Sequence, residues 1–198
     1  MSSGIDIQLV RERYQSMSDK EIIRVLTQDA AGLTVEALEV VNEEIKRRNL
    51  NPNISKGVEA QQKSYTVQEI DAYCELIQNL PCPVTGSTSE KLNATLTVDV
   101  VSYIFLTQSK KKIIVGSPAV LDKANDKSAI KSALLGWWGI PWGLFKTPQA
   151  IFRNLRNKKT NHLNTPNDYL RSFVLANIGQ IETYKDNKDK LREILSID

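Results

Sequence analysis

The stretch "LNATLTVDVV", residues 92–101, decides the fold class of this 198-residue chain. Apolar residues stand at every second position from Leu92 to Val100, and polar residues stand between them. This alternation predicts a β-strand with one buried and one exposed face. The run "VVSYIFLT", three lysines at 110–112 and a short "IIV" then predict a return strand, with the lysines at the turn.

Helical patterns surround this ribbon on both sides. A capping box at Ser18 and Glu21 opens one helix, and a second helix follows it. Residues 51–64 are polar, contain a proline and a glycine and show no period, which predicts a linker. We therefore expect an α+β protein with an N-terminal helical hairpin in 1–50, the linker, and a small antiparallel ribbon packed with helices in 65–198. Within the last part we expect the ribbon at 80–120, a tryptophan-rich segment at 132–146 and C-terminal helices.

The second informative stretch is "KSALLGWWGIPWGLFKTPQ", residues 131–149, which holds all three tryptophans of the chain. Three glycines and a proline stand among them, and a proline costs about 3 kcal/mol in a helix interior. The apolar run is therefore expected to break at Gly139–Pro141 into two limbs. Thr147 and Pro148 then predict the start of the next helix, as N-cap and first helical residue.

The charge pattern around this segment favours contact with a membrane from one side. Ser132–Phe145 carry no formal charge, and these 14 residues would measure about 21 Å as a helix, against roughly 30 Å of hydrocarbon. Basic residues flank both ends, and no acid lies between Lys127 and His162, so both ends are expected on the cytoplasmic side. We expect a non-enzymatic protein that attaches peripherally to the inner face of a membrane, or to a membrane protein, helped by the basic helix that follows. The predicted contact residues are Leu134, Leu135, Trp137, Trp138, Ile140, Trp142, Phe145, Lys146, Arg153, Arg156, Lys158 and Lys159.

Two other interpretations of the tryptophans stay open. They can belong to a core or an intramolecular lid, because glycines beside aromatic residues allow close packing. The protein would then be a soluble adaptor that docks a protein partner through its N-terminal helices. A nucleic-acid-binding module is the third interpretation, because Gly136 and Gly139 have G-x-x-G spacing near several lysines. Two adjacent tryptophans fit such a phosphate-contacting loop poorly.

Two short segments flank the strands in a recognisable spacing. "CPVT" begins at Cys82, and "GSPA" follows the strands. These segments resemble the two knuckles of a zinc ribbon, whose pattern is C-x-x-C, a hairpin and a second C-x-x-C. Only Cys82 matches a ligand position, while Thr85, Gly116 and Ala119 stand at the other three, so the resemblance implies a ribbon that has lost its metal. With its helical front end and "GWWGIPWG", the chain resembles uncharacterised bacterial proteins, for which the resemblance implies no established activity.

Composition and missing motifs exclude several classes of function. A net charge of +3 is too small for the whole molecule to act as a polyanion binder. Two cysteines are too few for a disulfide scaffold, and the N-terminus has no signal-peptide pattern, so we expect a cytoplasmic protein. The sole histidine, His162, lies in a polar stretch, and no phosphate-binding, dinucleotide or zinc-protease motif is present. We therefore expect no catalytic site, cofactor, metal or small-molecule substrate.

Overall fold

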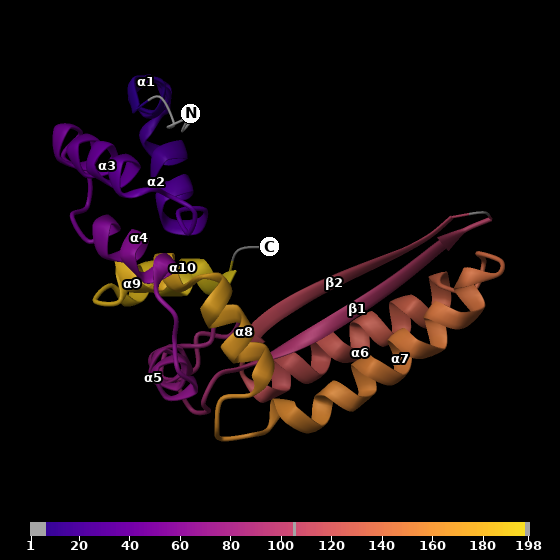
Figure 1. Cartoon of the computed structure of the whole chain (residues 1–198). Coiled ribbons are helices and arrows are strands. Elements are labelled where there is room, and N and C mark those ends of the chain that lie inside the picture. The colour runs from indigo at the N-terminus through magenta and orange to yellow at the C-terminus, as the bar shows by residue number, and fades with distance from the viewer. Residues whose placement is uncertain (1–6, 105, 197–198) are drawn as a thin grey trace. The chain divides into compact units, whose positions relative to one another are not determined.

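The computed structural model describes residues 7–104 and 106–196. Over these residues the chain forms ten helices and one antiparallel pair of strands, so the α+β prediction is confirmed (Figure 1). The chain folds into two compact units. Unit 1 combines the chain up to residue 66 with residues 175–191, and unit 2 combines residues 67–174 with the chain from residue 192 onward.

Unit 1 is helical and has an apolar core. The predicted capping box is present: the Ser18 amide donates to the Glu21 carboxylate at 2.9 Å, and the Glu21 amide donates to Ser18 Oγ at 3.4 Å. The helices of this unit are α1 (Ile7–Ser16), α2 (Asp19–Gln28), α3 (Val35–Arg47), α4 (Ile54–Gln62) and α9 (Ile178–Tyr184). They bury Tyr14, Ile22, Leu26, Ala30, Val40, Val41, Ile45, Ile54 and Val58 in one cluster.

The linker predicted at 51–64 is wrong over most of its length, because α4 occupies it. This helix packs closely against α9, and a Cβ atom at Gly57 would clash with the Gly179 carbonyl and the Thr183 hydroxyl. Glycine is required there because the two backbones nearly touch. The apolar face of α4 is short, and its partner helix lies far along the chain, so no local pattern marks the segment as helical.

Unit 2 contains α5 (Val67–Gln78) and a body of two strands and two helices. We call β1, β2, α6 and α7 together the hairpin body, in which both helices run alongside the two long strands (Figure 1). The strands pair antiparallel in register from Asn93 with Gly116 to Tyr103 with Leu106. The bounds are β1 Asn93–Tyr103, β2 Leu106–Gly116, α6 Pro118–Leu135 and α7 Trp142–Asn161, while α8 (Asp168–Ala176) and α10 (Lys188–Ser196) each cross a boundary between the units.

Two predicted boundaries in the hairpin body are wrong. The strands turn between Tyr103 and Leu106, so the lysines at 110–112 lie inside β2 instead of at its tip. Helix α7 begins at Trp142, which places Pro148 inside its second turn and not at the first helical position. The predicted break is confirmed, because α6 ends before the Gly139–Pro141 segment and α7 starts after it.

Strand β1 is buried on both faces, in contrast to the predicted half-buried strand. Thr95 and Thr97 are as inaccessible as Ala94 and Val98 on the opposite face. The reason is that the free edge of β1 lies against both α6 and α7, whereas β2 is covered only slightly. A period-2 pattern predicts which residues share a face but not how many faces are covered.

Polar side chains of the helices close the free edge of β1. The Asn154 amide accepts from the Val98 N–H at 2.9 Å and donates to the Val98 carbonyl at 2.8 Å. Ser132 Oγ accepts from the Val100 N–H at 2.9 Å. Helix side chains therefore supply the hydrogen bonds that a third strand would otherwise make. In the same way, the side-chain amides of Asn157 and Asn125 donate to the Leu96 carbonyl, and the side-chain amide of Asn167 donates to the Ala94 carbonyl.

Candidate functional site

The connection between α6 and α7 packs against the turn end of the strands. Ser102 Oγ donates a hydrogen bond to the Gly136 carbonyl at 2.5 Å. A Cβ atom at Gly139 would clash with the side chains of Ser102 and Thr107, so this close approach requires glycine. Two segments that lie far apart in the sequence are thereby joined at one end of the hairpin body.

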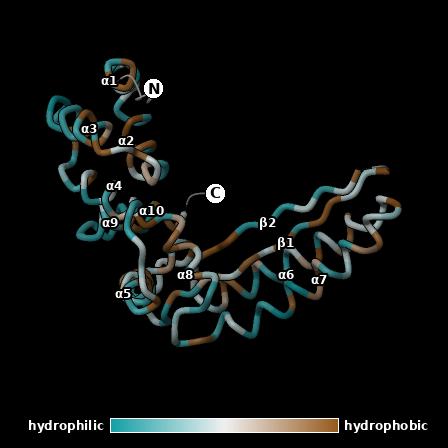
Figure 2. The backbone as a smooth tube through the Cα atoms, in the orientation of Figure 1, coloured by the Kyte–Doolittle hydropathy of each residue, from teal (hydrophilic) through white to brown (hydrophobic). Residues whose placement is uncertain are grey.

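The glycines of the tryptophan segment face inward and its large side chains face outward. Gly136, Gly139 and Gly143 are buried, whereas Trp138 is 70% and Trp142 61% exposed. Exposed apolar residues from both segments gather there, and hydrophobic colour marks both segments in Figure 2. We call this surface the apolar tip: Tyr103, Ile104, Leu106, Leu134, Leu135, Trp137, Trp138, Ile140, Trp142, Leu144 and Phe145.

The interpretation that places the tryptophans in a core is wrong. Trp137 is the least exposed of the three, and its side chain is still 40% accessible. Ile140 and Phe145 beside them are each more than 70% exposed. Several large apolar side chains exposed close together are uncommon in monomeric proteins and are typical of a binding surface.

Two of the indole groups satisfy their polar atoms within the tip. Trp137 Nε1 donates to the Ala133 carbonyl at 2.8 Å, and Trp138 Nε1 donates to the Leu134 carbonyl at 3.3 Å. These bonds cap carbonyls in the last turn of α6, which have no partner within the helix. The exposed parts of both rings are therefore apolar, and moving them out of water leaves no indole N–H without a partner.

Four of the five predicted basic residues on α7 are available for an anionic partner. Lys146 Nζ lies 6.0 Å from the centre of the Trp142 ring, so it stands directly behind the apolar tip. Arg153, Arg156 and Lys159 are exposed along the rest of the helix. Lys158 differs, because its ammonium group pairs with both carboxylate oxygens of Asp126 at 2.9 Å.

Sequence reasoning missed the contribution of the strands to this surface. Tyr103, Ile104 and Leu106 are 62%, 73% and 56% exposed at the turn end of the hairpin. The run "YIFL" is unusually apolar for a turn, and this signal was available. The turn is instead predicted at the lysines 110–112, because charged residues are common in turns.

The two segments that resemble zinc-ribbon knuckles do meet in space. Burial raises the pKa of the Cys82 thiol, but hydrogen bonds from Thr85, Ser117 and Val84 outweigh this and lower the pKa to about 7. Ser117 belongs to the second segment, so its backbone N–H points at the sulfur from across the ribbon. Among the described residues, no group of three His, Cys, Asp or Glu side chains is placed to hold a metal ion.

Neither a known protein family nor a curated protein or solved structure matches this chain. The resemblance to a metal-free zinc ribbon therefore stays a prediction that rests on Cys82, Thr85 and the segment around Ser117. Within residues 7–104 and 106–196, no helix combines the length and the hydropathy needed to cross a bilayer.

Proposed function

We propose that this protein has no catalytic activity and attaches peripherally to the anionic inner leaflet of a membrane through the apolar tip. One observation carries the proposal: large apolar side chains from two separate segments share one end of the hairpin body, and Lys146 lies directly behind them, with Arg153, Arg156 and Lys159 exposed further along the same helix. An apolar surface with cations at its rim is complementary to hydrocarbon beneath a layer of anionic headgroups.

The available free energy is sufficient for such attachment. Three tryptophans carry roughly 150–250 Å² each, so transferring half of this area at about 25 cal/mol/Å² contributes on the order of 5–9 kcal/mol. Each basic residue near an anionic surface adds roughly 1 kcal/mol. The tip is already ordered by the Ser102–Gly136 contact, so little conformational entropy is lost on binding.

The polar interior of the hairpin body supports the same proposal. Backbone groups in an apolar medium must find partners within the protein, because unpaired groups cost several kcal/mol each. Near the tip, Ser132 and Asn154 provide those partners for the free edge of β1. The β1 edge is therefore closed at Val98 and Val100, next to the strand end that reaches the tip.

Vesicle co-sedimentation tests the proposal with a matched pair of double variants. The tip variant is Trp138→Ala/Phe145→Ala, and the control is Leu9→Ala/Val35→Ala, which removes two equally exposed apolar side chains from unit 1. Vesicles of phosphatidylcholine with phosphatidylserine should sediment the wild type and the control alike. The tip variant should bind at least about a hundredfold more weakly, because two large side chains no longer enter the hydrocarbon.

Two results would argue against lipid attachment. The wild type could remain in the supernatant with anionic vesicles of purified lipid, which is also the result expected if binding requires a membrane protein. The tip variant could instead sediment as well as the control. A nucleic-acid-binding role would instead show lipid-independent binding to single-stranded nucleic acid that weakens steeply with salt.

A further inference from the structure

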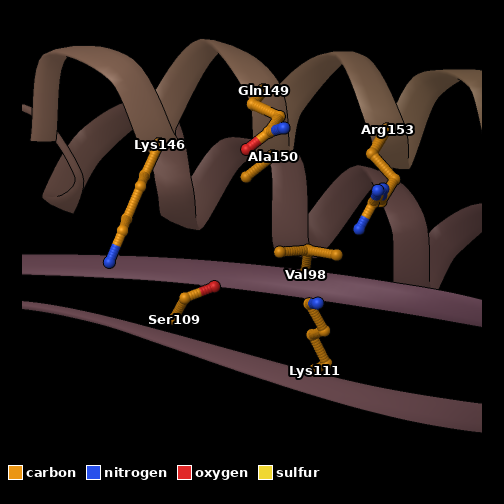
Figure 3. A pocket seen from close by; sticks show the side chains of 7 residues that line it. All are labelled: Val98, Ser109, Lys111, Lys146, Gln149, Ala150 and Arg153. Carbon is orange, nitrogen blue, oxygen red and sulfur yellow. The ribbon is translucent and has the colours of Figure 1, made fainter. Parts of the chain in front are cut away.

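A pocket of about 420 Å³ lies between α7 and the strands, beside the apolar tip (Figure 3). Val98 of β1 and Ala150 of α7 form its apolar part. Lys146, Gln149 and Arg153 line it from α7, and Ser109 and Lys111 line it from β2. In Figure 3 the side chains of Lys146 and Arg153 extend from the helix toward the strands, while Lys111 extends from β2 toward the helix.

The charge of this pocket is uncompensated. Lys111, Lys146 and Arg153 form no ion pair with any carboxylate of the described residues, and no acidic residue lines the pocket. Lys131 of the same body, by contrast, is paired: it contacts Asp99 at 2.6 Å, on the opposite face of β1 from Val98. Three like charges that line one pocket without a counter-charge repel one another, and an anion in the pocket would reduce that repulsion.

The donors in the pocket suit a phosphate group. Arg153 offers a planar guanidinium that can bind two oxygens of one phosphate, and the two lysines supply point charges. Ser109 and Gln149 add neutral hydrogen-bond donors at the wall. Val98 and Ala150 keep water from one side, so each charged contact is stronger than on an open surface.

The position of the pocket beside the apolar tip favours a lipid headgroup as the source of the phosphate. Lys146 directly follows Phe145 of the apolar tip, and Arg153 lies seven residues later in the same helix, about 10 Å along its axis. The headgroup layer of one leaflet is roughly 5–8 Å thick. Because Lys146 directly follows the tip, the near end of the pocket reaches this headgroup layer when the tip is in the hydrocarbon.

We propose that the pocket binds the phosphate group of an anionic phospholipid headgroup, between Lys111, Lys146 and Arg153. This inference rests on the proposed attachment through the apolar tip and adds a specific headgroup site to it. It places charge recognition in a defined pocket, as distinct from a general attraction by the basic surface of α7.

The test compares two double variants with the same change in net charge. Lys111→Gln/Arg153→Gln removes two pocket cations and leaves the tip and Lys146 intact. The control, Lys123→Gln/Lys127→Gln, removes two exposed lysines of α6 that line no part of the pocket. Affinities are measured for phosphatidylcholine vesicles with and without phosphatidic acid, and separately for soluble glycerol phosphate and inorganic phosphate by calorimetry.

The pocket variant should lose about 30-fold in affinity for phosphatidic acid vesicles, because two cations no longer contact the phosphate, while the control loses much less. Soluble glycerol phosphate should bind the wild type weakly and the pocket variant not at all. Equal losses in both variants would overturn the headgroup site and leave attachment by the tip intact. Tight binding of inorganic phosphate that phosphatidic acid vesicles do not compete away would show a free-phosphate site and would overturn the lipid assignment.

Failure of the proposed function gives a different pattern of results. Wild-type protein would then bind none of the vesicles, whatever their composition, and the lipid headgroup site would fail with it. Binding to anionic vesicles that depends on Trp138 and Phe145 but not on Lys111 and Arg153 would instead remove only the headgroup site.

Discussion

Unit 1 and the hairpin body bury opposite kinds of side chain. The core of unit 1 is formed by residues such as Ile22, Leu26 and Val41, which are almost inaccessible to solvent. In the hairpin body, by contrast, the seam between β1 and the two helices is filled largely by Asn and Ser side chains. Leu121, Val98 and Val100 are buried there, but most large apolar residues of α6 and α7 lie outside, at the apolar tip and along the outer faces of the helices, as Ile130, Phe152 and Leu155 illustrate.

The difference follows from the backbone hydrogen bonds that each region has to complete. Helices complete their backbone hydrogen bonds internally, so the helices of unit 1 pack mainly through apolar side chains, with polar links such as those of Gln61 and Arg48 at chain ends and turns. Strand β1 has a free edge, and short polar side chains such as Asn154 and Ser132 reach its backbone groups. Because these residues occupy the inner stripe of α6 and α7, the apolar residues of both helices are displaced to the outside, where they are available to a partner.

The largest expected effect comes from truncating one apolar residue in each region. Leu26→Ala should lower the free energy of unfolding by about 2–5 kcal/mol, because it leaves a cavity in the core of unit 1. Trp138→Ala removes a larger side chain but should change the free energy of unfolding by less than about 0.5 kcal/mol, because the Trp138 side chain is exposed. Urea denaturation followed by circular dichroism measures both. Similar losses for the two variants would mean that the tip is packed, and the contrast between the regions would fail.

The second prediction concerns the closed edge of β1. Asn154→Leu should cost about 1–3 kcal/mol, because the Val98 N–H loses its acceptor, whereas the Val98 carbonyl keeps the Ser132 hydroxyl as a donor at 3.2 Å. Asn164→Leu, a change of the same kind at an exposed loop position, should be nearly neutral. Hydrogen exchange at the Val98 amide provides the direct readout, and protection there should fall only in the first variant. Unchanged protection in Asn154→Leu would show that the helices do not close the edge.

The third prediction uses the pH dependence of stability. Folding lowers the pKa of Cys82 to about 7, so the folded state favours the thiolate, and stability from this group grows as the pH rises from about 7 to 9. The gain should reach about 2 kcal/mol at most and disappear in Cys82→Ala. Folding raises the pKa of Cys74 to about 12, so that thiol reduces stability as the pH rises through the ordinary thiol range, equally in the wild type and in Cys82→Ala, and the difference between the two curves isolates Cys82. A wild type and a Cys82→Ala variant with parallel stability curves between pH 7 and 9 would contradict the hydrogen bonding of the thiolate.

The smallest expected effect concerns the ion pair between Lys158 and Asp126. This pair is partly exposed, so Asp126→Asn should lower the free energy of unfolding by only about 0.2–1 kcal/mol. The change frees Lys158 on α7, so affinity for anionic vesicles should rise up to about fivefold. Asp189→Asn makes the same change in net charge at an exposed position of α10 and should leave vesicle affinity almost unaltered. An equal rise in both variants would assign the effect to net charge.

Part of this architecture follows from local sequence alone. Capping at Ser18 and Glu21, the strand beginning near Leu92 and the break at Gly139–Pro141 each depend on neighbouring residues, so all three are predictable. The outward position of the tryptophan side chains is not predictable from the sequence, because the same residues would suit a buried core equally well.

The tertiary structure alone decided which faces are covered and which residues share a site. The free edge of β1 requires polar partners from α6 and α7, so Asn154 and Ser132 point inward although both are polar. A helix with small polar residues on one face and aromatic residues on the other could pack with either face inward. Only the neighbouring backbone edge of a strand, which needs polar partners, determines that the polar face packs inward. The same packing brings Lys111 of β2 opposite Arg153 of α7, a proximity set by long-range contacts that no spacing in the sequence encodes.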